Sequence, residues 1–189
     1  MKPRACLFPV LLMLVCLPAR AQSVGRRAPS NETSDIEVTR AATLRITLAS
    51  DPVNIFDYLV DAKKLEGWFP DQAVSEAQLG GRYHFHWDEK PGVWSGRFTY
   101  FIRGNSLSYT WQAPDDEYET SVQFKLSPQG PGTLVELTHS GFPSNLAMDK
   151  SIKAWVFYLE NLRSVIEDGT DLREAQRRPP ARRKSGRNE

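Results

Sequence analysis

A regular alternation of apolar and polar residues runs through the middle of the chain, and it constrains the fold more than any other feature. Tyr83, Phe85 and Trp87 fall on one face of a predicted strand, because side chains in a strand alternate with a period of two. Further segments with this period are separated by turn-forming pairs such as Pro91-Gly92 and Gly104-Asn105. The pattern predicts a meander of antiparallel strands that ends near His139.

One face of the predicted sheet is crowded with aromatic side chains. Parity along each strand puts them together, and we expect this face to point to the interior of the protein. His139 falls on the same side, in register with Val135 and Leu137. The residues that parity assigns to this inner face are Phe85, Trp87, Trp94, Phe98, Tyr100, Ile102, Tyr109, Trp111, Phe124 and His139.

Apolar residues at helical spacing flank the strand region. After a predicted strand at 44–48, Pro52 favours the first turn of a short helix, and a second short helix passes through Leu65. Between residues 152 and 166, apolar residues repeat every three or four positions, which predicts a long amphipathic helix closed by Gly169. A twisted sheet in so short a chain can bury only one of its faces. We therefore expect this helix to cover that face, which makes an α+β fold.

The N-terminus has the pattern of a secretory signal peptide. Lys2 and Arg4 precede an apolar run over residues 7–17, and small residues end the segment at Ala21. A retained membrane anchor is the alternative, but a spanning helix needs about 20 apolar residues and this run is shorter. We therefore expect cleavage near Ala21 and a secreted or periplasmic protein with no integral membrane span after the signal is removed.

The remaining chain divides by composition into three parts. Residues 22–35 are polar and predict a flexible linker, residues 36–170 carry the periodic patterns of the domain, and residues 171–189 predict a basic, disordered tail. The domain holds 12 basic and 18 acidic side chains. Its net negative charge argues against a nucleic-acid partner, because phosphate contacts need positive faces.

Metal and thiol chemistry have little support in the sequence. Cys6 and Cys16 both lie in the predicted signal peptide, so no disulfide, thiol nucleophile or thiolate ligand is expected in the mature chain. His84 and His86 have a spacing that could begin a zinc site, with Asp88 in register. That face lies opposite the aromatic one, so we interpret both histidines as solvent-facing and expect no metal and no cofactor.

Five segments resemble a known superfamily in the same order and with fitting spacing. They are similar to the START-like superfamily, which includes the polyketide cyclases and the birch-pollen allergen, and most closely resemble the activator of heat-shock-protein-90 ATPase homologue family. The segments are ASDPVNIFDYLVDAKKLEGWFP (49–70), GGRYHFHW (80–87), WSGRFTYFIRGNSLSYTW (94–111), GTLVELTHSGF (132–142) and WVFYLENLRSVIE (155–167).

The resemblance implies a helix-grip fold: a curved antiparallel sheet wrapped around a long C-terminal helix, with two short helices after the first strand. It also implies a cavity between sheet and helix that accepts hydrophobic ligands. A shared fold does not transfer a reaction. The intracellular chaperone partner that gives the family its name is not carried over, because this chain has an export signal.

A hydrophobic or amphipathic small molecule is the partner that these features favour. Trp68 and Phe69 follow the short helices and are expected at the rim, facing Trp155 and Leu159 on the long helix. An apolar cavity with a few polar groups is the usual small-molecule site. The predicted ligand-binding residues are Trp68, Phe69, Phe85, Trp87, Trp94, Phe98, Tyr100, Tyr109, Trp111, Phe124, His139, Trp155 and Leu159.

Two other functions stay open. As an enzyme, such as a cyclase or hydrolase, the protein would use His139 as acid or base and Tyr100 or Tyr109 to stabilise charge. His139 has a purely structural alternative, a hydrogen bond to the Ser140-Gly141 turn, and we favour a binding protein over an enzyme. As an interaction module, the protein would instead use the outer sheet face or the basic tail on an unidentified protein partner.

Overall fold

The computed structural model describes residues 40–177. The predicted signal peptide and linker lie outside the described residues, and so does the last part of the predicted tail, from residue 178 onward. No helix within 40–177 is long and apolar enough to cross a membrane.

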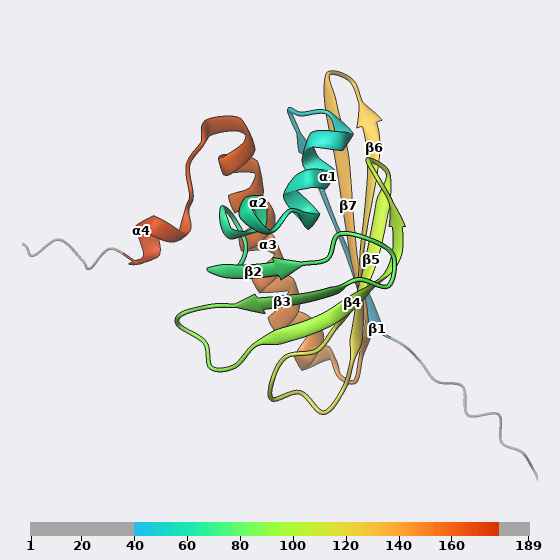
Figure 1. Cartoon of the computed structure of the whole chain (residues 1–189), viewed down its shortest axis with the longest axis vertical. Helices are drawn as coiled ribbons and strands as arrows, with labels where there is room; N and C mark the ends of the chain where they lie inside the picture. Colours follow the sequence, from blue (N-terminus) through green and yellow to red (C-terminus); the bar gives the residue numbers. More distant parts are fainter. Residues whose placement is uncertain (1–39, 178–189) are drawn as a thin grey trace, which may run out of the picture. The chain divides into compact units, whose positions relative to one another are not determined.

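Seven antiparallel strands form one sheet in the order β1-β7-β6-β5-β4-β3-β2 (Figure 1). The strands from β2 to β7 each pair with the next in sequence, which confirms the predicted meander, and β1 joins its far edge beside β7. The strand bounds are β1 Arg40–Leu48, β2 Gln72–Ser75, β3 Arg82–His86, β4 Trp94–Ile102, β5 Ser106–Trp111, β6 Thr120–Gln129 and β7 Gly132–Phe142.

Two short helices follow β1, as predicted. Helix α1 (Pro52–Val60) begins after Asp51, whose carboxylate accepts hydrogen bonds at 3.0 Å from the amides of Val53 and Asn54. This is the capping contact that satisfies otherwise unpaired amides at a helix start. Helix α2 (Ala62–Glu66) is capped in the same way by Asp61.

The long helix α3 (Asn145–Asp168) packs against the sheet (Figure 1). Ser144 caps its first turn, and Gly169 ends it in the left-handed conformation with φ of 69°, which glycine adopts without strain. The predicted α+β helix-grip fold is confirmed by the sheet, the two short helices and the long C-terminal helix.

The end of the sheet–helix interface beside α1 and α2 is filled. Leu48, Ile55 and Leu162 are fully buried there, and Trp68 is only 1% exposed. The Trp68 indole donates to the carbonyl of Tyr58 at 2.9 Å. The prediction that Trp68 lies at a cavity rim is therefore wrong: the turn after α2 directs this ring into the core.

A β-bulge in β4 changes which side chains face inward. Phe98 pairs with Tyr109 but Tyr100 pairs with Ser108, so β4 carries one extra residue at this point. The extra residue reverses the alternation of side chains beyond it. Tyr100 and Ile102, both predicted inside, are each 46% exposed, and Phe101 packs inward at 5.1 Å from the ring of Phe56.

The folded region extends beyond the predicted boundary at residue 170. Residues Arg173–Arg177 form a short helix, α4, and Arg173 is only 7% exposed. Its guanidinium pairs with Asp171 at 2.8 Å and donates to three backbone carbonyls. These carbonyls belong to Glu66 (2.6 Å), Phe69 (3.0 Å) and Pro70 (2.8 Å). The disorder expected from residue 171 is therefore not found for 171–177.

Candidate functional site

A pocket of about 480 Å³ opens at the other end of the sheet–helix interface. It lies between the first half of α3 and the ends of the strands from β3 to β7, and the loops 87–93 and 112–119 border it. Its volume falls within the range of small-molecule sites. The lining side chains are Phe69, Trp87, Lys90, Trp94, Trp111, Asp116, Tyr118, Thr120, His139, Phe142, Ser144, Leu146, Ala147, Lys150, Ser151, Ala154, Trp155 and Tyr158.

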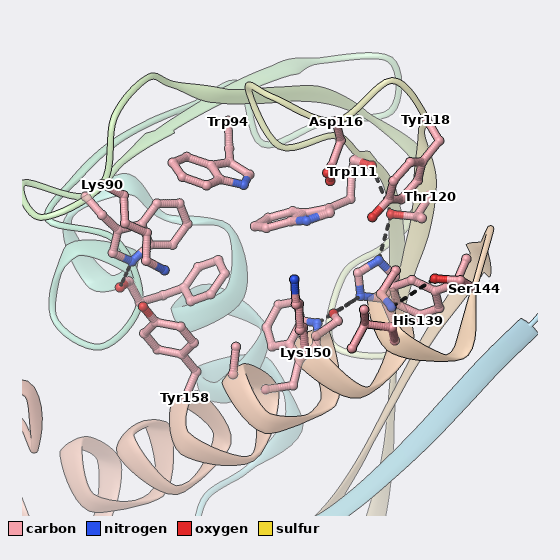
Figure 2. A pocket seen from close by; sticks show the side chains of 18 residues that line it. Lys90, Trp94, Trp111, Asp116, Tyr118, Thr120, His139, Ser144, Lys150 and Tyr158 are labelled. Atoms are coloured by element: carbon pink, nitrogen blue, oxygen red, sulfur yellow. Dashed lines mark hydrogen bonds between the residues drawn. The ribbon is translucent and has the colours of Figure 1, made fainter.

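Aromatic rings make up the walls of this pocket. Figure 2 shows Trp94 and Trp111 on the side of the sheet and α3 on the opposite side. Phe69 stacks on Trp155 with ring centroids 5.1 Å apart, and Trp155 lies 6.0 Å from Trp111. Trp87 packs edge-on against Trp94 at 4.9 Å. Large rings in contact with one another present a preformed apolar surface to a ligand.

The structure brings only part of the predicted binding set together. The predicted residues that line the pocket are Phe69, Trp87, Trp94, Trp111, His139 and Trp155. The others, apart from Tyr100, belong to the closed core, namely Trp68, Phe85, Phe98, Tyr109, Phe124 and Leu159. Tyr100 lies on the outer face of the sheet beside Ser108 and Lys125.

His139 lies at the bottom of the pocket, with 2% exposure, and both its ring nitrogens are bonded (Figure 2). Trp155 donates its indole N–H to Nδ1 at 3.0 Å, and the Ser151 hydroxyl lies 2.9 Å from the same nitrogen. The Thr120 hydroxyl lies 2.7 Å from Nε2 and itself donates to the carbonyl of Trp111 at 2.9 Å.

These contacts determine the protonation of the imidazole. An indole only donates, so Nδ1 of His139 accepts and Nε2 carries the hydrogen that it gives to Thr120. Burial lowers the pKa of His139 to about 4, which keeps the ring neutral. With the Nδ1 lone pair already occupied, His139 is poorly placed as a general base. Its bonds hold α3 to the sheet, and they run to Thr120, Ser151 and Trp155 instead of the Ser140-Gly141 turn.

The tyrosines of the enzyme hypothesis do not converge on His139. Burial raises the pKa of Tyr109 well above its ordinary value, and its ring packs in the core at 5.3 Å from the ring of Tyr83. Tyr100 lies outside the pocket altogether. Within residues 40–177, no three histidine, aspartate or glutamate side chains are grouped so that they could hold a metal ion.

Lys90 is a pocket residue that the sequence analysis missed. Its ammonium lies over the ring of Trp87 at 4.9 Å, with Trp94 at 5.8 Å and Tyr158 at 5.9 Å. Cations are attracted to aromatic faces at such distances. Partial burial lowers the pKa of Lys90, because it removes water from around the charged ammonium. Because Lys90 comes from a turn, no strand or helix periodicity pointed to it.

The fold and the pocket define the class of protein. A curved sheet that grips a C-terminal helix and leaves an aromatic pocket between them is the START-like arrangement. The model of one family, described as activator of Hsp90 ATPase homolog 1-like protein, matches residues 49–167, well over half of the chain. The chain belongs to this family. No curated protein sequence matches it significantly.

Solved structures share the fold at low sequence identity. A protein from Mesorhizobium loti is similar over 70% of this chain and 100% of its own, with 24% identity and a TM-score of 0.63. The Aha1 dimer from Colwellia psychrerythraea is similar over 69% and 98%, with 20% identity and a TM-score of 0.61. An HSP90 activator from Plasmodium falciparum is similar over 66% and 94%, with 18% identity and a TM-score of 0.57.

Proposed function

We propose that this protein binds a hydrophobic or amphipathic small molecule in the pocket between α3 and the sheet. The observation that carries the proposal is the pocket itself, about 480 Å³ and lined by four tryptophans, at the end of the interface opposite the buried core beside α1 and α2. Apolar area removed from water contributes roughly 25 cal/mol per Å², so such walls supply the main driving force for binding.

The polar groups of the pocket favour binding over catalysis. His139 is neutral and fully bonded, and its partners Thr120 and Ser151 also line the pocket. After these hydrogen bonds are made, each of the two hydroxyls still has a lone pair that can accept a hydrogen bond from a ligand. These groups can fix the orientation of a bound molecule, whereas neither Tyr100 nor Tyr109 lines the pocket with His139, as the enzyme hypothesis requires.

We also propose that the protein acts outside the cytoplasm. The support is the signal-peptide pattern of residues 1–21. Mass spectrometry of the N-terminus of the protein recovered from the exported fraction tests this proposal. We expect the chain to begin at Gln22, and an intact Met1 in the cytoplasmic fraction would overturn it.

Native mass spectrometry of the purified protein, prepared without detergent from the cells that make it, tests ligand binding. We expect a reproducible extra mass that is lost on denaturation. Ala154→Phe places a ring at the pocket wall and should abolish the extra mass, whereas the matched control Val156→Phe changes an exposed residue on the same helix and should keep it. A ligand-free mass that persists after incubation with lipids and aromatic compounds would refute the proposal.

A co-chaperone-like interaction is the alternative, because two of the similar structures are named Aha1 and an HSP90 activator. To test this alternative, the rate of ATP hydrolysis by purified Hsp90 is measured with and without this protein. We expect no change, because the proposed function, binding of a small molecule, does not involve Hsp90. Stimulation of the ATPase would favour the co-chaperone function instead.

A further inference from the structure

We propose that the ligand carries an acidic group, such as a carboxylate, and that Lys90 is its counter-ion. The inference rests on the proposed function and specifies its ligand class. Lys90 holds its ammonium at the pocket wall, over the rings of Trp87, Trp94 and Tyr158. An amphipathic acid would place its apolar part on the aromatic walls and its anionic head on this ammonium.

No salt bridge joins Lys90 to a carboxylate within residues 40–177, although Asp71 and Glu89 both attract its charge. Its nearby rings attract the charge but accept no conventional hydrogen bond, so the donors of the ammonium remain available to a ligand. Asp71, which attracts Lys90 most strongly, is already paired with Arg173 at 3.7 Å and with Arg177. Two arginines thus neutralise Asp71, and the ammonium of Lys90 remains available to a ligand in the pocket.

The remaining charges around the pocket are consistent with an anion. Lys150, on α3, adds a second ammonium, and Asp116, from the loop 112–119, is the one carboxylate among the lining residues. Figure 2 shows Asp116 next to Trp111, whereas Lys90 lies at the far end of the pocket beside Tyr158. The Lys90 ammonium thus lies at the end of the pocket formed by Trp87, Trp94 and Tyr158, away from the Asp116 carboxylate.

A pair of fluorescent probes tests the charge of the ligand separately from the existence of the pocket. N-phenyl-naphthylamine is uncharged, and anilinonaphthalene sulfonate is the same molecule with an added anionic group. Both are titrated into the purified full chain. We expect wild type to prefer the sulfonate by about tenfold, which is the usual worth of one charge-assisted hydrogen bond.

The Lys90→Met variant keeps an unbranched chain over the rings but removes the charge, so it should lose this preference, and Lys90→Arg should restore most of it. The control Lys125→Met removes an equal charge from the outer face of the sheet and should keep the preference. An equal affinity of wild type for both probes, or a preference that survives in Lys90→Met, would overturn the inference and leave the proposed function standing. Failure of wild type to bind either probe would refute both.

Discussion

The two ends of the interface between α3 and the sheet are built from the same kinds of side chain but differ in packing. At the α1–α2 end, Trp68 and Leu162 are buried among their neighbours with no more than 1% exposure. At the other end, Trp111 and Trp155 border an open pocket. The short helices supply the extra apolar side chains at the first end, whereas only loops flank the second. The cavity thus reflects which elements are present, not a shortage of apolar residues.

The largest expected effect on stability comes from creating a cavity at the filled end of the interface. Trp68→Ala removes a fully buried ring and its hydrogen bond to Tyr58, so the free energy of unfolding should fall by about 3–5 kcal/mol. Urea denaturation followed by circular dichroism measures this change. A loss below about 1 kcal/mol would mean that this end has room to adjust and is not close-packed.

An intermediate effect on the free energy of unfolding is expected when His139, at the pocket end, is exposed to acid. The pKa of His139 is about 4 in the folded protein against 6.5 ordinarily, so the unfolded chain binds more protons between these values. Stability should therefore fall as pH decreases from about 6.5 to about 4, by about 3 kcal/mol from this group.

The matched comparison is His139→Gln, which has no proton to gain. Urea denaturation near pH 7 and near pH 4.5 should show a smaller loss for the variant, because carboxylate titration is common to both proteins. If wild type and variant lose equal stability on acidification, then His139 is not the group responsible and its burial has little energetic effect.

The smallest effect on stability is expected at the pocket wall itself. Trp94→Ala removes a tryptophan, as Trp68→Ala does, but this ring is only partly buried and its main contact is Trp87 at 4.9 Å. We expect a loss of about 1 kcal/mol in urea denaturation. The variant should nevertheless bind the uncharged probe more weakly than wild type. A loss as large as that of Trp68→Ala would show that both ends are packed alike.

The sheet and the long helix could be predicted because each depends on local periodicity. Turn residues and alternation over many positions located the meander, and Gly169 marked the end of the helix. Tyr100 was placed on the wrong face because a bulge shifts parity by one residue, and the alternation Phe98-Thr99-Tyr100 looks regular in sequence.

The site was harder to predict than the fold. Strand parity identifies which rings face inward but not which end of the interface is filled, so the prediction groups Tyr109 and Phe124 with true pocket residues. Lys90 comes from a turn, where no periodic signal exists. Arg173 lies in a segment whose composition is typical of disorder, and its burial depends on carbonyls about a hundred residues away.

The distribution of tryptophans makes the protein its own optical reporter. Four of its five tryptophans, namely Trp87, Trp94, Trp111 and Trp155, border the pocket, and the fifth is sealed in the core. Intrinsic fluorescence therefore originates mainly at the site where a ligand would lie, over a constant background from Trp68. Occupancy of the pocket can be followed on the unmodified protein, without a label and before the natural ligand is identified.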